Sequence, residues 1–372
     1  MKIAELKRTY KKYGAGRMIS LLESALAPSE GKHRLRAEEF SIRELWEGLV
    51  GPVSQTLGDG GSGFVMLRED AVDSMAFSDI IGVLLASKVI EGYNTPGYIG
   101  DQLVTRVPSK RKEERYAGFT EMGGPREVPE AMPYEETGFQ DKYAVSEATK
   151  KGRLLNITEE AILFDQTGQL LMRAAGLGEK ARLDKEIVIL QGIVDTAGTV
   201  YSPQGVAEAI YRLVATATSW TINQLGGNAL VDWTDIDNIM QVFAAMTDSR
   251  GNQIVIVPKI LLTPYSLAAV ANRILKATQI RTAVGVTETI SGNPITGLAP
   301  LSSPLLDNDS ITNYYLGDFA KQFVWQEIWP LQVARKKLES EAHVRDIIVS
   351  YKVRYFGGIA AIDDKYVVRG TL

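Results

Sequence analysis

Residues capable of covalent or metal chemistry are few in this sequence. The chain of 372 residues has no cysteine and only two histidines, His33 and His343. Without cysteine there is no thiol nucleophile, no disulfide and no zinc–thiolate site, and two histidines cannot build an imidazole cluster. A Ser-His-Asp triad would need one of these histidines, and neither is accompanied by a G-x-S-x-G motif. We therefore predict no catalytic residues, no metal site and no cofactor.

One glycine-rich stretch matches a nucleotide-binding pattern. Residues 58–63 read GDGGSG, which fits G-x-G-x-x-G. In a dinucleotide-binding site these glycines follow a strand and open a helix, so that the backbone can approach a pyrophosphate. The residues before this stretch include Gly51-Pro52 and make a poor strand, and the residues after it do not resemble the start of a helix. A flexible loop is the better interpretation, and a dinucleotide-binding enzyme stays as a remote alternative.

Charge is unevenly distributed along the chain. The net charge is −4, whereas residues 1–36, the arm, carry a net +6. Residues 106–115 carry a net +3, and residues 121–141, the acidic segment, a net −5. A solvated surface is the ordinary interpretation of one such run, but runs of opposite sign favour edges that guide register between copies. Our candidate subunit-interface residues are Lys7, Arg8, Lys11, Lys12, Arg17, Arg111, Lys112, Glu127, Glu130, Glu135 and Glu136.

Length and composition indicate an ordinary globular protein. The chain is 45% hydrophobic and 23% charged, and its length suggests two or three domains. No uninterrupted apolar run approaches the roughly 18 to 20 residues of a membrane span. We expect a soluble protein without a global affinity for nucleic acid or acidic lipid.

The N-terminal half shows helical periodicity around a long loop. Ile42, Leu45, Trp46 and Leu49 form an apolar stripe behind a possible Ser41 cap. Residues 79–90 fit either a buried helix or a strand. Residues 117–138 are rich in Gly, Pro and Glu and have no apolar periodicity, which predicts a functional loop.

A long helix is predicted over residues 156–188. Asn156 or Thr158 can cap it, and the helix dipole favours the acidic residues in its first turn. Glycines at 168, 176 and 178 weaken the helix and predict a bend or break. A shorter helix is predicted after Pro203.

The C-terminal half mixes helices and strands. Asp232 and Asp235 open a helix, residues 254–257 predict a short buried strand, and Thr263 predicts the cap of a helix that starts at Pro264. Residues 347–356 alternate as a strand that Gly357-Gly358 should interrupt. Because the elements do not alternate regularly, we predict an α+β fold.

The order of these elements resembles the major capsid protein of tailed bacteriophages, whose fold was first described for phage Hong Kong 97. Each matching stretch is degenerate, and their order makes the resemblance specific. The stretches are residues 40–50 (FSIRELWEGLV), 88–103 (KVIEGYNTPGYIGDQL), 127–139 (EVPEAMPYEETGF), 156–187, 249–265 (SRGNQIVIVPKILLTPY), 313–317 (NYYLG) and 350–369.

The resemblance implies a division into parts. Residues 1–103 would be an N-terminal arm and residues 104–155 an extended loop, a β-hairpin that reaches across a neighbour. Residues 156–200 and 321–362 would form a peripheral domain with a long spine helix. Residues 201–320 and 363–372 would form an axial domain.

The resemblance also implies a structural role. The chain would assemble as hexamers and pentamers into the icosahedral head of the virion, in the cytoplasm of a bacterial host. Its implied partners are further copies of itself, a portal protein and packaged double-stranded DNA, with a separate scaffolding protein and a decoration protein as options, and no membrane. The alternative is an encapsulin-like compartment, which has the same fold and encloses enzymes instead of DNA.

Overall fold

The computed structural model describes residues 8, 12–13, 17, 20, 22, 41–49, 68–117, 128–130, 143–195, 197–203, 205–214, 222–247, 251–284, 287–336 and 347–372. The chain forms two compact units. Unit 1 comprises Met1–Gly97, Lys150–Asp184 and Trp329–Tyr355, and unit 2 comprises Tyr98–Thr149, Lys185–Ile328 and Phe356–Leu372. Both units combine helices and strands, so the predicted α+β class is confirmed. The finer division into arm, extended loop, peripheral and axial domains stays a prediction.

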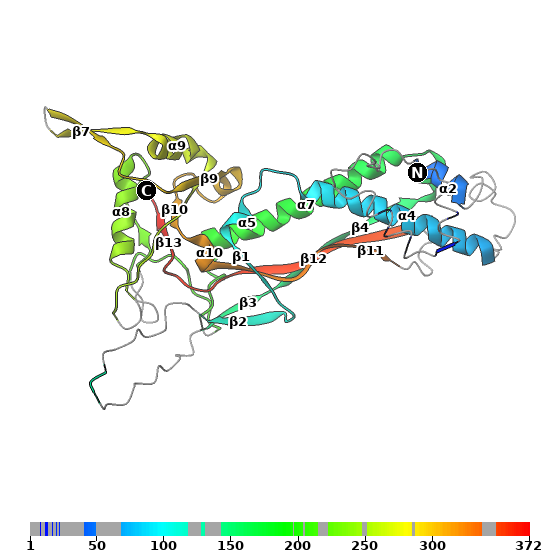
Figure 1. Ribbon diagram of the computed structural model, residues 1–372, viewed down its shortest axis with the longest axis horizontal. Helices are drawn as coiled ribbons and strands as arrows, with labels where there is room; N and C mark the ends of the chain where they lie inside the picture. The colour runs from blue at the N-terminus through cyan, green and yellow to red at the C-terminus, as the bar shows by residue number, and fades with distance from the viewer. Residues whose placement is uncertain are drawn as a thin grey trace. The chain divides into compact units, whose positions relative to one another are not determined.

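Unit 1 is a layer of helices on a sheet. Figure 1 draws α4 and the first part of α7 side by side over one face of β4, β11 and β12. These three strands belong to a four-stranded sheet of order β1-β11-β12-β4, in which β1 (Thr105–Pro108) is part of unit 2. The elements with residues in this unit are α2 (Ile42–Leu49), α4 (Arg68–Tyr93), α6 (Glu159–Leu163), α7 (Thr167–Val194), β4 (Thr149–Thr158), β11 (Phe323–Lys336) and β12 (Ile347–Ala361).

Helix α2 forms as its sequence predicts. The Oγ atom of Ser41 accepts a hydrogen bond from the backbone N–H of Glu44 at 3.2 Å, which satisfies one free donor of the first turn. The predicted apolar stripe of this helix is buried. Its Trp46 packs edge-on against Phe77 of α4, with ring centroids 4.8 Å apart. Residues 79–90 belong to helix α4, so the strand alternative for them is wrong.

The long helix predicted over residues 156–188 is two helices. Thr158 caps α6, as expected, because its Oγ1 accepts from the N–H of Ala161. The break follows at Asp165, whose φ of 47° lies in the left-handed region. The carboxylate of Asp165 accepts from the hydroxyl of Thr167 at 2.5 Å. This short-range polar contact ends α6 and begins α7.

Gly178 of α7 permits a close packing contact with α4. A Cβ atom at Gly178 would overlap the carbonyl oxygen of Val89, and a Cβ at Gly92 of α4 would overlap the carbonyl oxygen of Ala175. Helices α4 and α7 therefore touch backbone to backbone, which only glycine permits. The helix continues through all three glycines, so a break at them is wrong, and a bend stays a prediction.

Unit 2 contains a five-stranded sheet of order β5-β13-β10-β6-β9 and two separate hairpins, β2–β3 and β7–β8. In Figure 1 the β7–β8 ribbon extends beyond α9. The further elements of this unit are α5 (Gly100–Leu103), β1 (Thr105–Pro108), β2 (Glu113–Ala117), β3 (Tyr143–Glu147), β5 (Gln224–Leu225), α8 (Trp233–Ala244), β6 (Ile260–Pro264), η3 (Tyr265–Leu267), α9 (Ala268–Lys276), β7 (Gln279–Val284), β8 (Thr287–Gly292), β9 (Ala299–Ser303), η4 (Pro304–Asn308), β10 (Tyr314–Gly317), α10 (Phe319–Gln322) and β13 (Val367–Gly370).

Helix α8 is confirmed, together with its cap. Asp232 and Asp235 form a reciprocal capping box. The strand predicted at 254–257 is wrong, because Val255 is 86% exposed and the buried strand β6 lies further along the chain. Strand β6 pairs with β10 on one edge and β9 on the other. Since Thr263 and Pro264 end this strand, the predicted helix cap at Thr263 is also wrong.

No helix follows Pro203 among the residues described there. The carboxylate of Asp195 accepts hydrogen bonds from the backbone N–H groups of Thr199, Val200 and Ile210 at 3.1, 3.2 and 2.8 Å. Of these donors, Ile210 lies in the stretch predicted as a helix, where the N–H of Arg212 likewise bonds to Oδ1 of Asn223 at 2.8 Å instead of to a preceding helical turn. The predicted helix is wrong because the side chains of Asp195 and Asn223 accept hydrogen bonds from its backbone N–H groups.

Strand β12 confirms the predicted alternation and corrects its predicted end. Val349, Tyr351, Val353 and Tyr355 are buried on one face. The strand continues through Gly357 and Gly358. A Cβ at Gly357 would lie 2.7 Å from the ring of Trp325, and a Cβ at Gly358 would lie 2.6 Å from the carbonyl oxygen of Glu147. These glycines permit close packing and do not interrupt the strand.

Candidate subunit interface

The β2–β3 hairpin of unit 2 carries charged side chains in cross-strand pairs. Glu113 lies opposite Glu147, and Arg115 lies opposite Val145. Because residues directly opposite each other in an antiparallel pair share a face, two carboxylates meet at one end of the hairpin. Like charges in this position are destabilising unless a cation lies nearby.

A cation does lie nearby. The Nζ atom of Lys112 lies 2.6 Å from the carboxylate of Glu147, and both side chains are exposed. The hydrogen bond from Lys112 to Glu147, together with the attraction between their charges, raises the pKa of Lys112. Lys112, one of the predicted interface residues, thus relieves the repulsion between Glu113 and Glu147.

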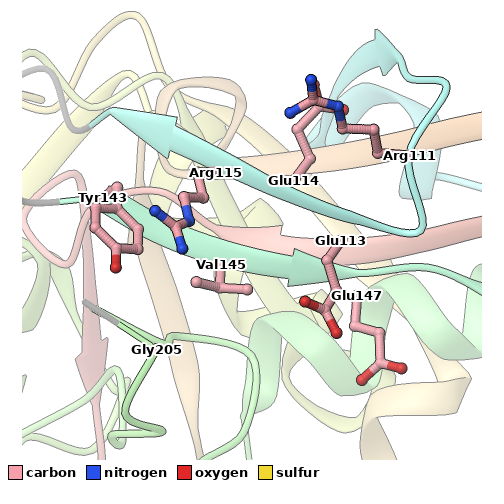
Figure 2. A pocket seen from close by; sticks show the side chains of 8 residues that line it. All are labelled: Arg111, Glu113, Glu114, Arg115, Tyr143, Val145, Glu147 and Gly205. Atoms are coloured by element: carbon pink, nitrogen blue, oxygen red, sulfur yellow. The ribbon is translucent and has the colours of Figure 1, made fainter.

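A pocket of about 560 Å³ lies beside this hairpin. Figure 2 shows its two kinds of wall: the guanidinium of Arg115 beside the ring of Tyr143, and the carboxylates of Glu113 and Glu147 close together. The guanidinium carbon of Arg115 lies 4.5 Å from the ring centroid of Tyr143, a cation–π contact. The lining residues are Arg111, Glu113, Glu114, Arg115, Tyr143, Val145, Glu147 and Gly205. A surface of mixed charge and one aromatic ring suits a polar, charged protein partner.

The other face of the hairpin is anchored by a buried amide. The hydroxyl of Ser146 donates to Oε1 of Gln326 at 2.6 Å, and Nε2 of Gln326 donates to the carbonyl oxygen of Arg111 at 2.7 Å. On this face the hydroxyl of Tyr116 is buried, and burial and then the charge of Glu114 raise its pKa to about 12. These hydrogen bonds fix the backbone at Arg111, just before β2. Arg111 is the second predicted interface residue at the base of the hairpin.

The start of the predicted extended loop is fixed to α7. The buried carboxylate of Glu186 accepts from the backbone N–H groups of Ile99 and Gly100 at 2.8 Å each. Next to it, Nζ of Lys185 lies 2.7 Å from the carboxylate of Asp101. A Cβ at Gly100 would lie 2.5 Å from Glu186, so glycine is required there. These contacts position the chain just before β1.

The structure describes part of the predicted basic arm. Arg8, Lys12 and Arg17 are exposed. The charges of Lys12 and Arg17 lie 5.1 and 4.7 Å from the ring centroid of Tyr13, so an aromatic ring gathers two of them. Lys7 and Lys11 lie outside the described residues.

Of the predicted acidic interface residues, only Glu130 is described, and it is exposed. Glu127, Glu135 and Glu136 lie outside the described residues, as do the glycine-rich stretch 58–63 and both histidines. In the part of the chain that is described, no group of three or more metal-ligating side chains could hold a metal ion. No helix in that part is long and apolar enough to cross a membrane.

The structure also assembles a basic surface in unit 1 that the sequence analysis missed. Lys150 of β4 and Arg354 of β12 both lie over the ring of Trp329 of β11, at 5.4 and 4.4 Å from its centroid. Lys352 is two residues from Arg354 on the same face of β12. We call these four residues the basic face. The available signal was composition: residues 149–158, 329–336 and 347–361 hold seven basic residues and no acidic one.

Comparison with known proteins decides the family. A model of the family described as phage capsid protein matches residues 142–370, more than half of the chain. The chain belongs to the phage capsid protein family. The expectation of a structural protein of the phage capsid is therefore confirmed. No curated protein matches the sequence.

Solved capsid structures are similar to this chain at low identity. The capsid of a native GTA particle is 14% identical, with 73% of this chain and 89% of that chain covered at a TM-score of 0.47. The capsid of Cyanophage P-SCSP1u is 11% identical, with 74% and 88% covered at a TM-score of 0.47. The SrpI encapsulin of Synechococcus elongatus PCC 7942 is 13% identical, with 73% and 85% covered at a TM-score of 0.38.

Proposed function

We propose that this capsid protein is the major head protein of a tailed phage. Five- and six-membered rings of the chain tile an icosahedral shell around double-stranded DNA, and assembly takes place in the bacterial cytoplasm. The observation that carries the proposal is the family match over residues 142–370. The anchored β2–β3 hairpin, with its charged exposed face, supports a role in reaching a neighbouring copy.

The role is structural and not enzymatic. Complementary charge guides register between copies, and the shell is stabilised by contacts summed over many subunits. Since the chain has no cysteine, disulfides cannot fasten neighbours together. The portal protein and the packaged DNA complete the particle, and a scaffolding or decoration protein is an optional partner.

Electron microscopy of particles purified from cells that express the chain tests this proposal. We expect closed shells built from rings. Nuclease-protected DNA in particles made with the packaging machinery supports the phage assignment, whereas enzyme cargo without DNA would identify an encapsulin-like compartment. A protein that stays small on size exclusion and whose residues 58–63 are protected by NAD would overturn both and support the dinucleotide alternative.

We further propose that the acidic segment of one copy docks on a basic surface of the next, with the arm residues Lys7, Arg8, Lys11, Lys12 and Arg17 as one acceptor. The net charges of −5 and +6 support this. Reversing Glu130, Glu135 and Glu136 to lysine should block or weaken assembly, measured as the sedimenting fraction. Replacing the same three residues with aspartate keeps the charge and is the matched control. Normal particles of normal stability from the lysine variant would refute the docking.

A further inference from the structure

The β2–β3 hairpin of unit 2 is supported on one face and along one edge. On its face, the buried amide of Gln326 bonds to Ser146 and to the backbone of Arg111. Along its edge, the backbone N–H of Val145 donates to the carbonyl oxygen of Ser202 at 3.1 Å. The face contact holds the hairpin at its base, and the edge contact restrains it from turning about that base.

The edge contact comes from residues 199–203 and 205–210, which we call the supporting loop. One carboxylate joins both ends of this loop. Oδ1 of Asp195 accepts hydrogen bonds from the backbone N–H groups of the first two loop residues at 3.1 and 3.2 Å, and Oδ2 accepts one from Ile210, the last loop residue, at 2.8 Å. Asp195 is only 7% exposed, so these bonds are shielded from competing water. Since Asp195 directly follows α7, the end of this helix holds the loop closed.

Further contacts close the supporting loop between its ends. The backbone N–H of Glu208 donates to the carbonyl oxygen of Tyr201 at 2.9 Å, and the guanidinium of Arg212 lies 2.8 Å from the carboxylate of Glu208. The same guanidinium lies over the ring of Tyr201, 5.8 Å from its centroid. The closed loop presents Ser202 and Pro203 to the outer edge of β3.

The chemistry at the closure requires a carboxylate. Both oxygens of a carboxylate accept hydrogen bonds and neither donates, which matches N–H groups on two sides. An amide at this position would keep one oxygen acceptor and would turn its NH₂ group toward the N–H of Ile210. A buried donor that faces another donor is unfavourable, so the loop would open at that end.

We propose that Asp195 is a positioning residue for the β2–β3 hairpin, and that it sets the direction of the hairpin within unit 2 by closing the supporting loop. The link runs from the end of α7 through the carbonyl group of Ser202 to the N–H group of Val145. Figure 2 shows the loop at Gly205 next to the strand that carries Val145. The link itself is internal to one chain, and only its consequence for assembly rests on the proposed function.

Hydrogen exchange of the unassembled protein tests the link. Asp195→Asn should speed exchange of the Ile210 amide, which loses its acceptor, and should also speed exchange of the Val145 amide by about tenfold, because the acceptor of Val145 moves with the loop. The amide of Ala148 donates to the carbonyl oxygen of Lys112 at the base of the hairpin, and its exchange should stay within about twofold of the wild type.

Two further variants make this result specific. Asp309→Asn, the matched control, removes the same charge at an exposed position of unit 2 and should leave the Val145 amide unchanged. Glu208→Gln loosens the supporting loop at its partly exposed ion pair and should speed exchange at Val145 by about threefold, which keeps the test decisive if circular dichroism shows that Asp195→Asn does not fold. Unchanged exchange at Val145 would overturn the proposal, and so would an equal rise at Ala148, because the whole hairpin would then have loosened.

Electron microscopy of assembled particles tests the consequence for the shell. If the hairpin meets a neighbouring copy, its direction affects the angle between the two copies. Asp195→Asn should then assemble into particles of several diameters, whereas Asp309→Asn should give the single diameter of the wild type. Uniform particles from Asp195→Asn, despite faster exchange at Val145, would refute a role of this residue in shell geometry. If the wild type forms no shell, the proposed function fails, and hydrogen exchange still decides the internal link.

Discussion

The interiors of the two units differ in how many charged side chains they bury. Unit 1 has an apolar core in which helices pack on a sheet, and its one buried charged side chain among the described residues is Arg182. The described part of unit 2 buries several charged side chains, namely Lys185, Glu186, Asp195, Arg212, Asp318, Asp363 and Asp364. Unit 1 should therefore be sensitive to changes of volume, and unit 2 to the loss of a single charge.

The largest expected effect is in unit 2, at Arg212. Its two terminal nitrogens each lie 2.8 Å from a carboxylate, one from Asp364 and one from Glu208, and Arg212 and Asp364 are nearly fully buried. Arg212→Met leaves a buried carboxylate without its counter-ion and should lower the free energy of unfolding by about 3 to 5 kcal/mol. Denaturant titration measures this.

The control for that variant neutralises both partners. Arg212→Met/Asp364→Asn should recover a large part of the loss, because the uncompensated charge is gone. If the double variant is as unstable as the single one, the arginine acts through packing and not through charge.

A smaller effect is expected in unit 1, at the contact between α4 and α7. Gly178→Ala places a methyl group against the carbonyl oxygen of Val89, and should lower the free energy of unfolding by about 3 kcal/mol. The matched control is Gly176→Ala in the same helix, where nothing lies within 4 Å of the new Cβ. This control should gain roughly 0.5 to 1 kcal/mol from helix propensity. Equal stability of the two variants would contradict the close backbone contact.

The smallest effect concerns pH, and its sign differs between the units. At Asp165 in unit 1, burial acts to raise the pKa, but hydrogen bonds from Thr167, Ser41 and Arg43 outweigh it and lower the pKa below 3.8. At Asp195 in unit 2, burial raises the pKa above 3.8 despite three backbone hydrogen bonds. Asp165 thus contributes stability above pH 3.8, and this is lost as the pH falls through its lowered pKa.

Asp195 behaves in the opposite way. Its charge is disfavoured in the folded state, so its contribution to stability rises as the pH falls through its raised pKa toward 3.8. Thermal unfolding of Asp165→Asn and of Asp195→Asn should be measured at a series of pH values. In each variant, the dependence of stability on pH that the replaced aspartate causes should be lost. A wild-type slope retained in the Asp195 variant between 3.8 and the raised pKa would assign that slope to another group.

Features of the fold that depend on neighbouring residues could be predicted from the sequence. The caps at Ser41, Thr158 and Asp232 act within three residues of their partners, so the local pattern suffices. The alternation of apolar residues along β12 likewise predicts which face of the strand is buried. These predictions succeed because the physical cause and its effect lie within one or two turns of the chain.

Features that depend on distant partners could not be predicted. A helix is predicted after Pro203, but the side chains of Asp195 and Asn223 accept hydrogen bonds from the backbone N–H groups of Ile210 and Arg212 there. From the sequence alone, Gly357 predicts the end of a strand. In the structure it permits close packing against the ring of Trp325. Both cases turn on a partner whose position only the fold supplies.

In the candidate interface, too, the local features could be predicted from the sequence and the long-range ones could not. Arg111 and Lys112 stand out as charges in one short run of sequence, and the structure places both at the base of the hairpin. The basic face joins Lys150 to Arg354 over Trp329, from strands separated by well over a hundred residues, so no local run of charge reveals it.

The contact between α4 and α7 has an evolutionary consequence. Gly92 and Gly178 each oppose a carbonyl group of the other helix and not a side chain. A larger residue at one of them therefore cannot be offset by a smaller residue opposite, because the backbone cannot shrink. Each position should be constrained by itself, so an alignment of relatives would show two fixed glycines without covariation, even though the two helices touch there.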